Sequence, residues 1–370
     1  MVSLAERLRV LALEPYYGGS HRAVLDGLAE RIDAEWTLLT LPPRKWKWRM
    51  RGSAINMAAD ASELARDRGE RPFDVIFAST FVNLAEFRGL AAPAVAAVPA
   101  IVYFHENQLV YPNRHTAEWD YQFPLTNITS ALTAERCLFN TRWNLERFVA
   151  EIPGFIREFP DHHPKGLAER IEAKSEVIAP PFDPAPFDAA PVVRGERCRI
   201  VWPHRWEHDK NPEEFFDAVT KLAGEGLDFE VVVAGQSFAE TRETMREAAA
   251  ALGDRLVHCE EPADRAAYAE LLASADVAVS TAINEFFGLA MMEACYAGAT
   301  PLVPDRLAYP ELYPAQYRYA SADQLVARLR ALILERPQTG TACALAEGFT
   351  FERLTADYER ALHAVAAAGR

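Results

Sequence analysis

The chain has 370 residues, of which 50% are hydrophobic and 25% are charged. This composition is typical of a globular protein and excludes a disordered or fibrous chain, and the length favours two domains over one. The formal net charge of −14 excludes a protein that coats nucleic acid non-specifically, because such binding needs many Lys and Arg side chains. A localised basic site is still compatible with this charge.

Segments that target or anchor a protein are not expected here. Glu6, Arg7 and Arg9 interrupt the apolar residues at the start of the chain, unlike the core of a secretory signal. The longest apolar run, 90–104, contains two prolines and is too short to span a bilayer. Five scattered cysteines show no paired spacing, which predicts a reducing, cytoplasmic location without disulfides.

The first half of the chain alternates short apolar runs with amphipathic segments, which predicts parallel βαβ units of an α/β fold. The expected strands are 8–13, 75–78, 100–104, 136–139 and 176–178, and helical patterns run to Ala29 and over 143–150. The same alternation of apolar runs and amphipathic segments begins again at Arg199. The second set of strands is 199–202, 230–233, 256–259, 277–280 and 301–303, with helices over 212–223 and 241–252, through Leu272, and after Glu285.

Proline-rich residues 180–191 separate the two halves and are interpreted as a linker, since neither helix nor strand continues through them. The sequence therefore predicts two domains, 1–180 and 192–350. Residues 351–370 have helical periodicity with no strand after them, so this helix must dock on existing surface.

Two glutamates separated by seven residues give the strongest chemical signal. On a continuous helix Glu285 and Glu293 would lie about 12 Å apart along the axis, which suits a nucleotide sugar. One carboxylate would accept hydrogen bonds from sugar hydroxyls, and the other would accept them from a ribose diol. Amides of Phe287, Gly288 and Leu289 would face a diphosphate. The alternative is that both glutamates are ordinary helix residues.

A cationic loop follows the strand that ends near Trp202. Arg205 and Lys210 leave the carboxyl end of that strand, where ligands of open α/β sheets bind, and two cations there would neutralise a departing diphosphate without a metal. The alternative is a solvated charged loop. His204 and His208 are not expected to hold zinc, because nearby prolines disfavour a helix.

Two further segments follow predicted strands of the first half. Gly18 and Gly19 open the first helix, where backbone amides could approach a phosphate, although glycine pairs also make ordinary turns. His105 and Asn107 belong to a polar cluster after the strand 100–104, and we expect this cluster to face a cleft between the domains. A lone histidine there could equally be structural.

Residues 44–51 alternate cations with large apolar side chains. An extended segment would carry a cationic face and an aromatic face, which suits RNA, since cations hold phosphates and indoles stack on bases. The alternative is a loop anchored by its tryptophans. The candidate acceptor-binding residues in this segment are Arg44, Lys45, Trp46, Lys47, Trp48, Arg49 and Arg51.

Together these motifs resemble the retaining GT-B glycosyltransferases that carry two glutamates separated by seven residues. The glycine pair, the Arg205 and Lys210 pair, the two glutamates and the turn 297–301 occur in that family's order. Within it, EPYYGGSHRAVLDGL, LPPRKWKWRMRGSA and YFHENQLVYP resemble the tRNA-queuosine α-mannosyltransferase family. The chain departs from the wider pattern at Phe286, where glycine is common.

The resemblance implies a GT-B fold with two Rossmann-like domains, an interdomain cleft, and a C-terminal helix packing back on the N-terminal domain. The N-terminal domain would bind the acceptor, queuosine in the anticodon of tRNA-Asp, and the C-terminal domain the donor GDP-mannose. Transfer would retain the anomeric configuration without a protein nucleophile, a metal or an obligate protein partner. The implied catalytic residues are His105, Arg205, Lys210 and Glu285, and the implied donor ligands also include Gly18, Gly19, Phe287, Gly288, Leu289 and Glu293.

Two other functions fit the same residues. One is a GT-B transferase with a lipid or polysaccharide acceptor, in which Trp46 and Trp48 dip into a membrane interface. The other is a non-catalytic nucleotide-sugar or RNA-binding protein that keeps the fold.

Overall fold

The computed structural model describes residues 7–111, 120–235 and 242–369. The chain forms two units, one made of 1–181 together with 351–370 and the other of 182–350. Both are α/β units built on a six-stranded parallel sheet, as the sequence predicts. The chain therefore leaves the first unit near Pro181 and returns to it at Phe351.

The first sheet has the order β2-β1-β3-β4-β5-β6. Its strands are β1 Leu8–Glu14, β2 Ala34–Thr40, β3 Val75–Ser79, β4 Ala100–Phe104, β5 Arg136–Phe139 and β6 Ser175–Val177. Its helices are α1 Gly19–Arg31, α2 Trp46–Ala65, α3 Leu84–Leu90, α4 Pro93–Ala96, α5 Gln122–Thr133, α6 Arg142–Arg157, α7 Leu167–Glu172 and α15 Phe351–Ala368. The order reverses between β1 and β3, which makes their carboxyl ends the topological switch point of this sheet.

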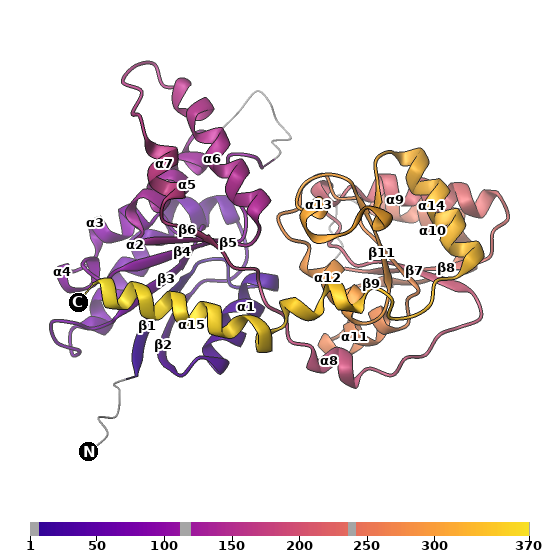
Figure 1. Ribbon diagram of the computed structural model, residues 1–370, viewed down its shortest axis with the longest axis horizontal. Helices are drawn as coiled ribbons and strands as arrows, with labels where there is room; N and C mark the ends of the chain where they lie inside the picture. Colours follow the sequence, from indigo (N-terminus) through magenta and orange to yellow (C-terminus); the bar gives the residue numbers. More distant parts are fainter. Residues whose placement is uncertain (1–6, 112–119, 236–241, 370) are drawn as a thin grey trace. The chain divides into compact units, whose positions relative to one another are not determined.

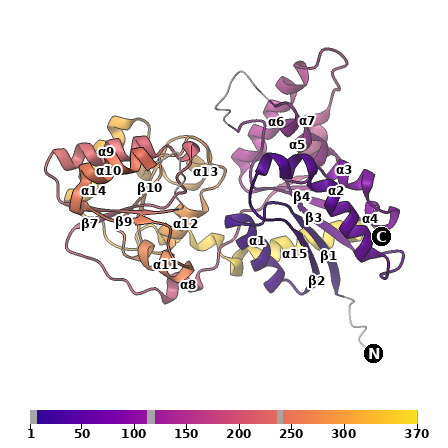
Figure 2. The same ribbon diagram turned by 180° about the vertical axis from the view of Figure 1, so that it is seen from behind.

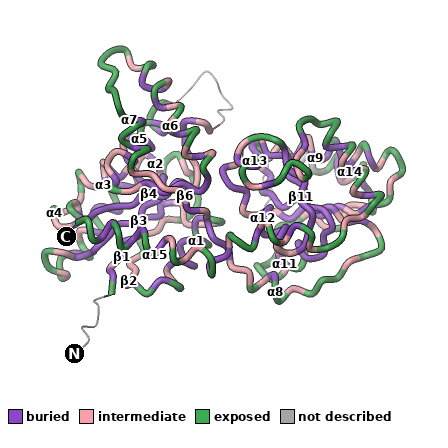
Figure 3. Tube along the Cα trace, viewed as in Figure 1, coloured by how far each residue is buried: buried purple, intermediate pink, exposed green. Residues whose placement is uncertain are grey.

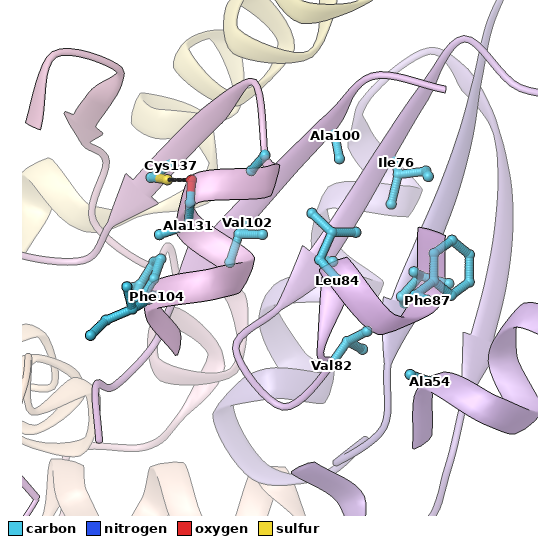
Figure 4. Close-up of a cluster of buried hydrophobic side chains, with 14 of the residues drawn as sticks. Ala54, Ile76, Val82, Leu84, Phe87, Ala100, Val102, Phe104, Ala131 and Cys137 are labelled. Carbon is cyan, nitrogen blue, oxygen red and sulfur yellow. Dashed lines mark hydrogen bonds between the residues drawn. The ribbon is translucent and has the colours of Figure 1, made fainter. Parts of the chain in front are cut away.

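Alternate side chains of each strand in the first sheet enter two different cores, as the period of two along a strand requires. On one face, Ile76 and Val102 pack with α2, α3 and α5 (Figure 4). On the other face, Phe77 and Tyr103 pack with α1 and α15. Figures 1 and 2 show α1 and α15 on one side of this sheet and α2, α3 and α5 on the other.

The last helix, α15, belongs to the first unit, which confirms that it packs back on the N-terminal domain. Tyr358 and Leu362 are buried among residues of β3 and β4, and the Tyr358 hydroxyl donates to the carbonyl of Ala179 over 3.0 Å. Phe351 packs against Gly27, where a Cβ atom would lie 1.9 Å from its ring. A side chain at Gly27 would therefore displace α15.

The second sheet has the order β12-β11-β10-β7-β8-β9. Its strands are β7 Cys198–Trp202, β8 Phe229–Ala234, β9 Leu256–Glu260, β10 Val277–Val279, β11 Thr300–Pro304 and β12 Arg318–Tyr319. Its α-helices are α8 Ala185–Ala189, α9 Pro212–Gly224, α10 Arg242–Leu252, α11 Arg265–Ala273, α12 Leu289–Tyr296, α13 Tyr309–Leu312 and α14 Ala322–Glu335. This is the doubly wound Rossmann order, whose switch point lies between β7 and β10.

The central strands of both sheets are almost entirely buried, because helices cover both faces, whereas the edge strands β2, β6 and β9 are partly exposed (Figure 3). In the second unit Ile200, Val231 and Val279 pack with α9, α10 and α14 on one face. The other face carries α11 and α12, whose buried residues include Leu272 and Met292. Both switch points are therefore held by rigid, fully packed strands.

Several boundaries differ from the prediction. The edge strand β2 was not predicted, because most of its residues are only half buried and show no apolar run. The proline-rich segment 180–191 contains the helix α8, so it is not merely a linker. Thr241, the predicted start of a helix, lies outside the described residues. Within the described ranges, no helix is both long enough and apolar enough to cross a membrane.

Candidate active site

Lys210 and Glu285 meet at the switch point of the second sheet. The Nζ atom of Lys210 donates to Oε2 of Glu285 over 3.1 Å and to the carbonyl of Asn284 over 3.0 Å. The carboxylate of Asp209 lies 3.2 Å from the same Nζ. The side chains of Lys210 and Glu285 are 13% and 16% exposed, so this ion pair is largely removed from water.

Hydrogen bonds join the loops that carry the two residues. The loop after β10 reaches the loop after β7 where the Asn284 amide donates to the carbonyl of Asp209 over 3.1 Å. The Thr281 hydroxyl lies 2.8 Å and 2.9 Å from the carbonyls of Lys210 and Asn211. Asn211 has a φ of 50° and precedes α9, a conformation that asparagine tolerates better than most residues. These backbone contacts hold together the two loops that carry Lys210 and Glu285.

Electrostatics keep both members of the pair charged. Burial alone would raise the pKa of Glu285, but the charge of Lys210 and its hydrogen bond to the carboxylate outweigh burial and lower it. Burial would lower the pKa of Lys210, but Glu285 and Asp209 outweigh burial and raise it. Burial and the charge of Lys210 lower the pKa of His204 to about 3, so its imidazole is neutral. Its buried Nε2 has no hydrogen-bond partner among the described residues.

Arg205 lies in the same loop as Lys210 but differs from it in exposure. Its side chain is 53% exposed and its Nη2 lies 3.4 Å from Oε2 of Glu207. The structure therefore places one predicted cation inside the ion-paired group and the other at the surface of the loop.

The helix that the sequence predicts from Glu285 onward begins only at Leu289. Gly288 interrupts it with a φ of 85°, a left-handed conformation that glycine adopts without strain. Glu285 consequently lies in the preceding loop, where Oε1 accepts from the amide of Phe286 over 3.1 Å and from that of Phe287 over 3.5 Å. The expectation that Glu285 and Glu293 lie on one continuous helix is therefore wrong. The Phe287 amide, which was expected to face a diphosphate, donates a long hydrogen bond to Glu285 instead.

Glu293 is buried in α12 and pairs with Arg265 at the start of α11. Nη1 of Arg265 donates to Oε2 of Glu293 over 3.3 Å, and Nη2 donates to Oε1. The guanidinium also lies over the rings of Phe187 and Tyr268, 4.9 Å and 5.1 Å from their centroids. Sequence reasoning missed Arg265, because nothing in its spacing from Glu293 indicates a contact.

Of the glycine pair of the first unit, Gly18 has a packing role. A Cβ atom on Gly18 would lie 2.4 Å from Cγ of Pro43, so only glycine fits against that proline. Gly19 begins α1 with a φ of 53° and has open space around it. The close approach that the sequence assigns to a phosphate is, at Gly18, an approach to Pro43.

His105 and Asn107 follow β4 but have different environments. The ring of His105 stacks on that of His21, with centroids 3.9 Å apart. Asn107 is fully buried; its Nδ2 donates to Asn144 over 2.5 Å and its Oδ1 accepts from the Leu109 amide over 3.2 Å. In this structure the Asn107 amide is buried and turned to partners within its own unit, and its contact with an acceptor stays a prediction. Asn107 shapes the loop that carries His105.

The basic and aromatic segment is not extended. Its residues from Trp46 onward form the first turns of α2, so the predicted cationic and aromatic faces do not exist. Lys45 caps the helix with a φ of 56° and without a side-chain hydrogen bond. Trp46 packs against Phe123, with ring centroids 5.0 Å apart, whereas the side chain of Trp48 is 70% exposed. The helix therefore separates the two tryptophans into a packed one and a solvent-facing one.

The cations of this segment also divide into two groups. Arg49 donates from Nη2 to the carbonyl of Pro42 over 3.2 Å, and Arg51 pairs with Asp120. The remaining basic residues of the segment are exposed, and these are Arg44, Lys45 and Lys47. The first turn of α2 has no acidic residue, and a helix dipole disfavours cations at this end. The helix dipole therefore does not explain these cations, although the Nζ atom of Lys47 also lies over the Trp46 ring, 5.7 Å from its centroid.

Two family models match the chain. Residues 9–182 match the N-terminal region of tRNA-queuosine alpha-mannosyltransferase, and residues 188–338 match glycosyl transferases group 1. The first match covers the unit with the basic helix start, and the second covers both loops that hold Lys210 and Glu285.

Among curated proteins, the tRNA-queuosine alpha-mannosyltransferase of Drosophila melanogaster is 36% identical over 367 residues, which are 94% of this chain and 93% of the relative. A Mycobacterium tuberculosis GDP-mannose-dependent alpha-(1-6)-phosphatidylinositol dimannoside mannosyltransferase is 32% identical, over 44% of this chain and 43% of the relative.

Solved glycosyltransferase structures share the fold. Anabaena HepE in complex with UDP has a TM-score of 0.68 and 14% identity, covering 98% of this chain and 100% of HepE. Sucrose-phosphate synthase from Thermosynechococcus elongatus has a TM-score of 0.70 and 14% identity, covering 97% of this chain and 100% of that one. By its near-full-length similarity and its two Rossmann-like units, this chain is a GT-B glycosyltransferase that belongs to the tRNA-queuosine alpha-mannosyltransferase family.

Proposed function

We propose that this chain transfers mannose from GDP-mannose to queuosine in the anticodon of tRNA-Asp, in the cytoplasm, with retention at the anomeric carbon. The observation that carries the proposal is the 36% identity to a tRNA-queuosine alpha-mannosyltransferase over nearly the whole of both chains. GDP-mannose as donor is also supported by the mycobacterial relative, which is a GDP-mannose-dependent mannosyltransferase.

The ion pair at the second switch point suits the donor half of this reaction. As the bond between the anomeric carbon and the diphosphate oxygen breaks, negative charge grows on that oxygen, and Lys210 and Arg205 would stabilise it without a metal. Glu285 would accept a hydrogen bond from a mannose hydroxyl. The proton of the attacking acceptor hydroxyl would pass to the departing phosphate, so no protein nucleophile is needed.

The start of α2 suits the acceptor half. Arg44, Lys45 and Lys47 are exposed and would neutralise phosphates of the anticodon stem-loop, while the exposed indole of Trp48 would stack on a base. The overall negative charge does not oppose this contact, because charges more than about 8–10 Å away are largely screened at physiological ionic strength.

The test is transfer of radiolabelled mannose from GDP-mannose to purified tRNA-Asp with and without queuosine. We expect labelling of the queuosine-containing tRNA alone. Equal labelling of both tRNAs, or labelling of lipid vesicles containing phosphatidylinositol mannosides in place of tRNA, would contradict the proposed acceptor. Binding of GDP-mannose without transfer or hydrolysis would support the alternative of a non-catalytic sensor.

A further inference from the structure

His204 lies two residues after β7, at the switch point of the second sheet, and the proposed transfer gives it no role. The residue is only 4% exposed, and its buried Nε2 atom has no hydrogen-bond partner among the described residues. Buried polar atoms are nearly always paired in folded proteins, because an unpaired one is costly. An exception beside a candidate active site favours a partner that a ligand supplies.

Packing, rather than a hydrogen bond from Nε2, holds His204 in place. Its ring meets that of the buried Trp202 edge-on, with centroids 5.2 Å apart and an interplanar angle of 72°. The indole of Trp202 donates in turn to the Thr281 hydroxyl over 3.1 Å. The backbone of Gly235, the residue after β8, approaches so closely that a Cβ atom there would lie 1.9 Å from the carbonyl oxygen of His204. The imidazole is therefore positioned before Nε2 has a partner.

Two charged side chains face the imidazole, Lys210 from its own loop and Glu285 from the loop after β10. After burial, Lys210 has the largest effect on the pKa of His204 and lowers it, whereas Glu285 has a smaller, opposite effect. The ring therefore lies in a positive potential although the two neighbours form an ion pair. A neutral imidazole offers one N–H group and one lone pair, and its hydrogen-bond partner decides which nitrogen carries the proton.

An anionic oxygen suits this environment better than a metal ion or an uncharged hydroxyl. The positive potential that keeps His204 neutral also opposes a cation. A zinc site needs at least three protein ligands, and His208, the other histidine of the loop, is exposed whereas His204 is buried. An uncharged sugar hydroxyl gains little from the potential, whereas an N–H group that donates to an anion makes one of the stronger hydrogen bonds.

We propose that Nε2 of His204 donates a hydrogen bond to a diphosphate oxygen of the nucleotide-sugar donor. The inference rests on the proposed function, in which Lys210 and Arg205 neutralise the same diphosphate. A neutral donor adds a directed hydrogen bond without placing a second buried cation beside Lys210, and it strengthens as negative charge grows on the departing oxygen. Because protein atoms cover Nε2 in this structure, a neighbouring side chain must turn aside when the donor binds.

The test uses His204→Phe and His204→Gln in the full chain. His204→Phe keeps a ring to meet Trp202 but has no donor, whereas His204→Gln keeps an N–H donor but has no ring. The matched control is His208→Gln, since His208 is the exposed histidine of the same loop. Calorimetry without tRNA measures the affinities for GDP-mannose, GDP, inorganic pyrophosphate and guanosine, and Tm is measured on every variant.

We expect His204→Phe to bind GDP-mannose, GDP and pyrophosphate about 10- to 100-fold more weakly, the loss of one hydrogen bond to a charged group. Guanosine has no phosphate, so its affinity should not change. His204→Gln should recover part of the lost affinity, and His208→Gln should bind all four ligands as the wild type does. The Tm of His204→Phe should equal or exceed that of the wild type, because the variant removes a buried, unpaired polar atom.

Three results would overturn the inference. The first is unchanged affinity of His204→Phe for both GDP and pyrophosphate. The second is a loss of affinity for GDP-mannose alone, which would assign the hydrogen bond to a mannose hydroxyl instead. The third is a parallel fall of Tm and of all affinities, guanosine included, which would show that His204 only packs the walls of the donor site.

Failure of the proposed function is distinguishable from failure of this inference. A wild type that binds GDP but labels no tRNA would contradict the proposed acceptor and leave every binding measurement in place. A wild type that prefers UDP or ADP would contradict the proposed donor, and the same variants are then compared with that nucleotide and with pyrophosphate. A wild type that binds neither pyrophosphate nor any of the three nucleoside diphosphates would overturn both.

Discussion

The Nζ atom of Lys210 donates to Oε2 of Glu285 across 3.1 Å, although 75 residues separate them in the chain. Burial disfavours the charged form of each side chain. Each has its charged form maintained by the other, and both are less than one-fifth exposed. Removing Lys210 would leave the buried Glu285 carboxylate uncompensated, which is far more costly than removing both residues, whereas removing Glu285 would leave Lys210 with the Asp209 carboxylate 3.2 Å away.

The first prediction concerns this coupling. Lys210→Met should destabilise the second unit by about 3–5 kcal/mol, because it leaves the buried Glu285 carboxylate without its cationic partner. The double variant Lys210→Met with Glu285→Gln should recover much of that loss while remaining inactive. Urea unfolding of the wild type, the two single variants and the double variant forms a double-mutant cycle. Additive losses would show that the 3.1 Å contact contributes no coupling energy.

The second prediction concerns pH. The folded-state pKa of Glu285 is below its ordinary value of 4.5, so its contribution to stability is present above pH 4.5 and lost as pH falls through the lowered value. The folded-state pKa of Lys210 is above 10.5, so its contribution is present below pH 10.5 and lost as pH rises through the raised value. The stability difference between wild type and the double variant should therefore be constant from about pH 5 to 10. A slope near pH 7 in that difference would contradict the assignment.

The third prediction concerns Glu293. If its carboxylate accepts from the ribose diol, Glu293→Ala should weaken GDP binding by about 1.5–3 kcal/mol, since hydrogen bonds to charged groups have that magnitude. The wild type should bind GDP more tightly than 2′-deoxy-GDP, and Glu293→Ala should lose this preference. Arg265→Met serves as the comparison for Glu293→Ala, because it removes the side chain that donates to Glu293 but keeps the carboxylate. Calorimetry with both nucleotides decides, and an unchanged preference in Glu293→Ala would refute the ribose role.

The fourth prediction concerns metals. Lys210 and Arg205 are proposed to neutralise the departing diphosphate, so EDTA should leave kcat unchanged. Replacing both cations should lower kcat more than it raises the KM for GDP-mannose. Strong inhibition by EDTA, reversed by added Mg²⁺ or Mn²⁺, would assign leaving-group stabilisation to a metal instead.

The sequence predicts the two sheets well because buried parallel strands form short apolar runs, as in Ala100–Phe104. It fails at α2, where the alternation of cations and tryptophans suggests an extended chain. There Ala54, Met57 and Ala61 lie at helical spacing and pack in the core, and this tertiary contact decides the conformation.

The candidate site, like the fold, was predictable from the sequence only in part. The meeting of Lys210 and Glu285 follows from their placement at the carboxyl ends of strands that prove to be adjacent in the second sheet. The pairing of Glu293 with Arg265 did not follow, because a contact between residues of two different helices leaves no periodic signal. The ring stack of His21 on His105 likewise depends on side-chain packing that spacing does not encode.

The last prediction separates the two tryptophans of α2. Trp46 packs with Phe123 and is flanked by Phe81, whereas Trp48 is 70% exposed. Trp46→Ala should therefore lower Tm, because it leaves a cavity in an aromatic cluster. Trp48→Ala should leave Tm and GDP affinity unchanged but weaken tRNA binding by about 1–3 kcal/mol, the usual value of one stacked base.

Ile55 provides the matched control, since it is 56% exposed on the same helix two turns later. Ile55→Ala should change neither Tm nor tRNA affinity, because an aliphatic side chain at that distance from the cations offers a base no stacking surface. Tm, GDP affinity and tRNA affinity are measured on all three variants. If Trp48→Ala binds tRNA as tightly as the wild type, the exposed indole is not an acceptor contact, and the cations at the start of α2 lose their aromatic partner in recognition.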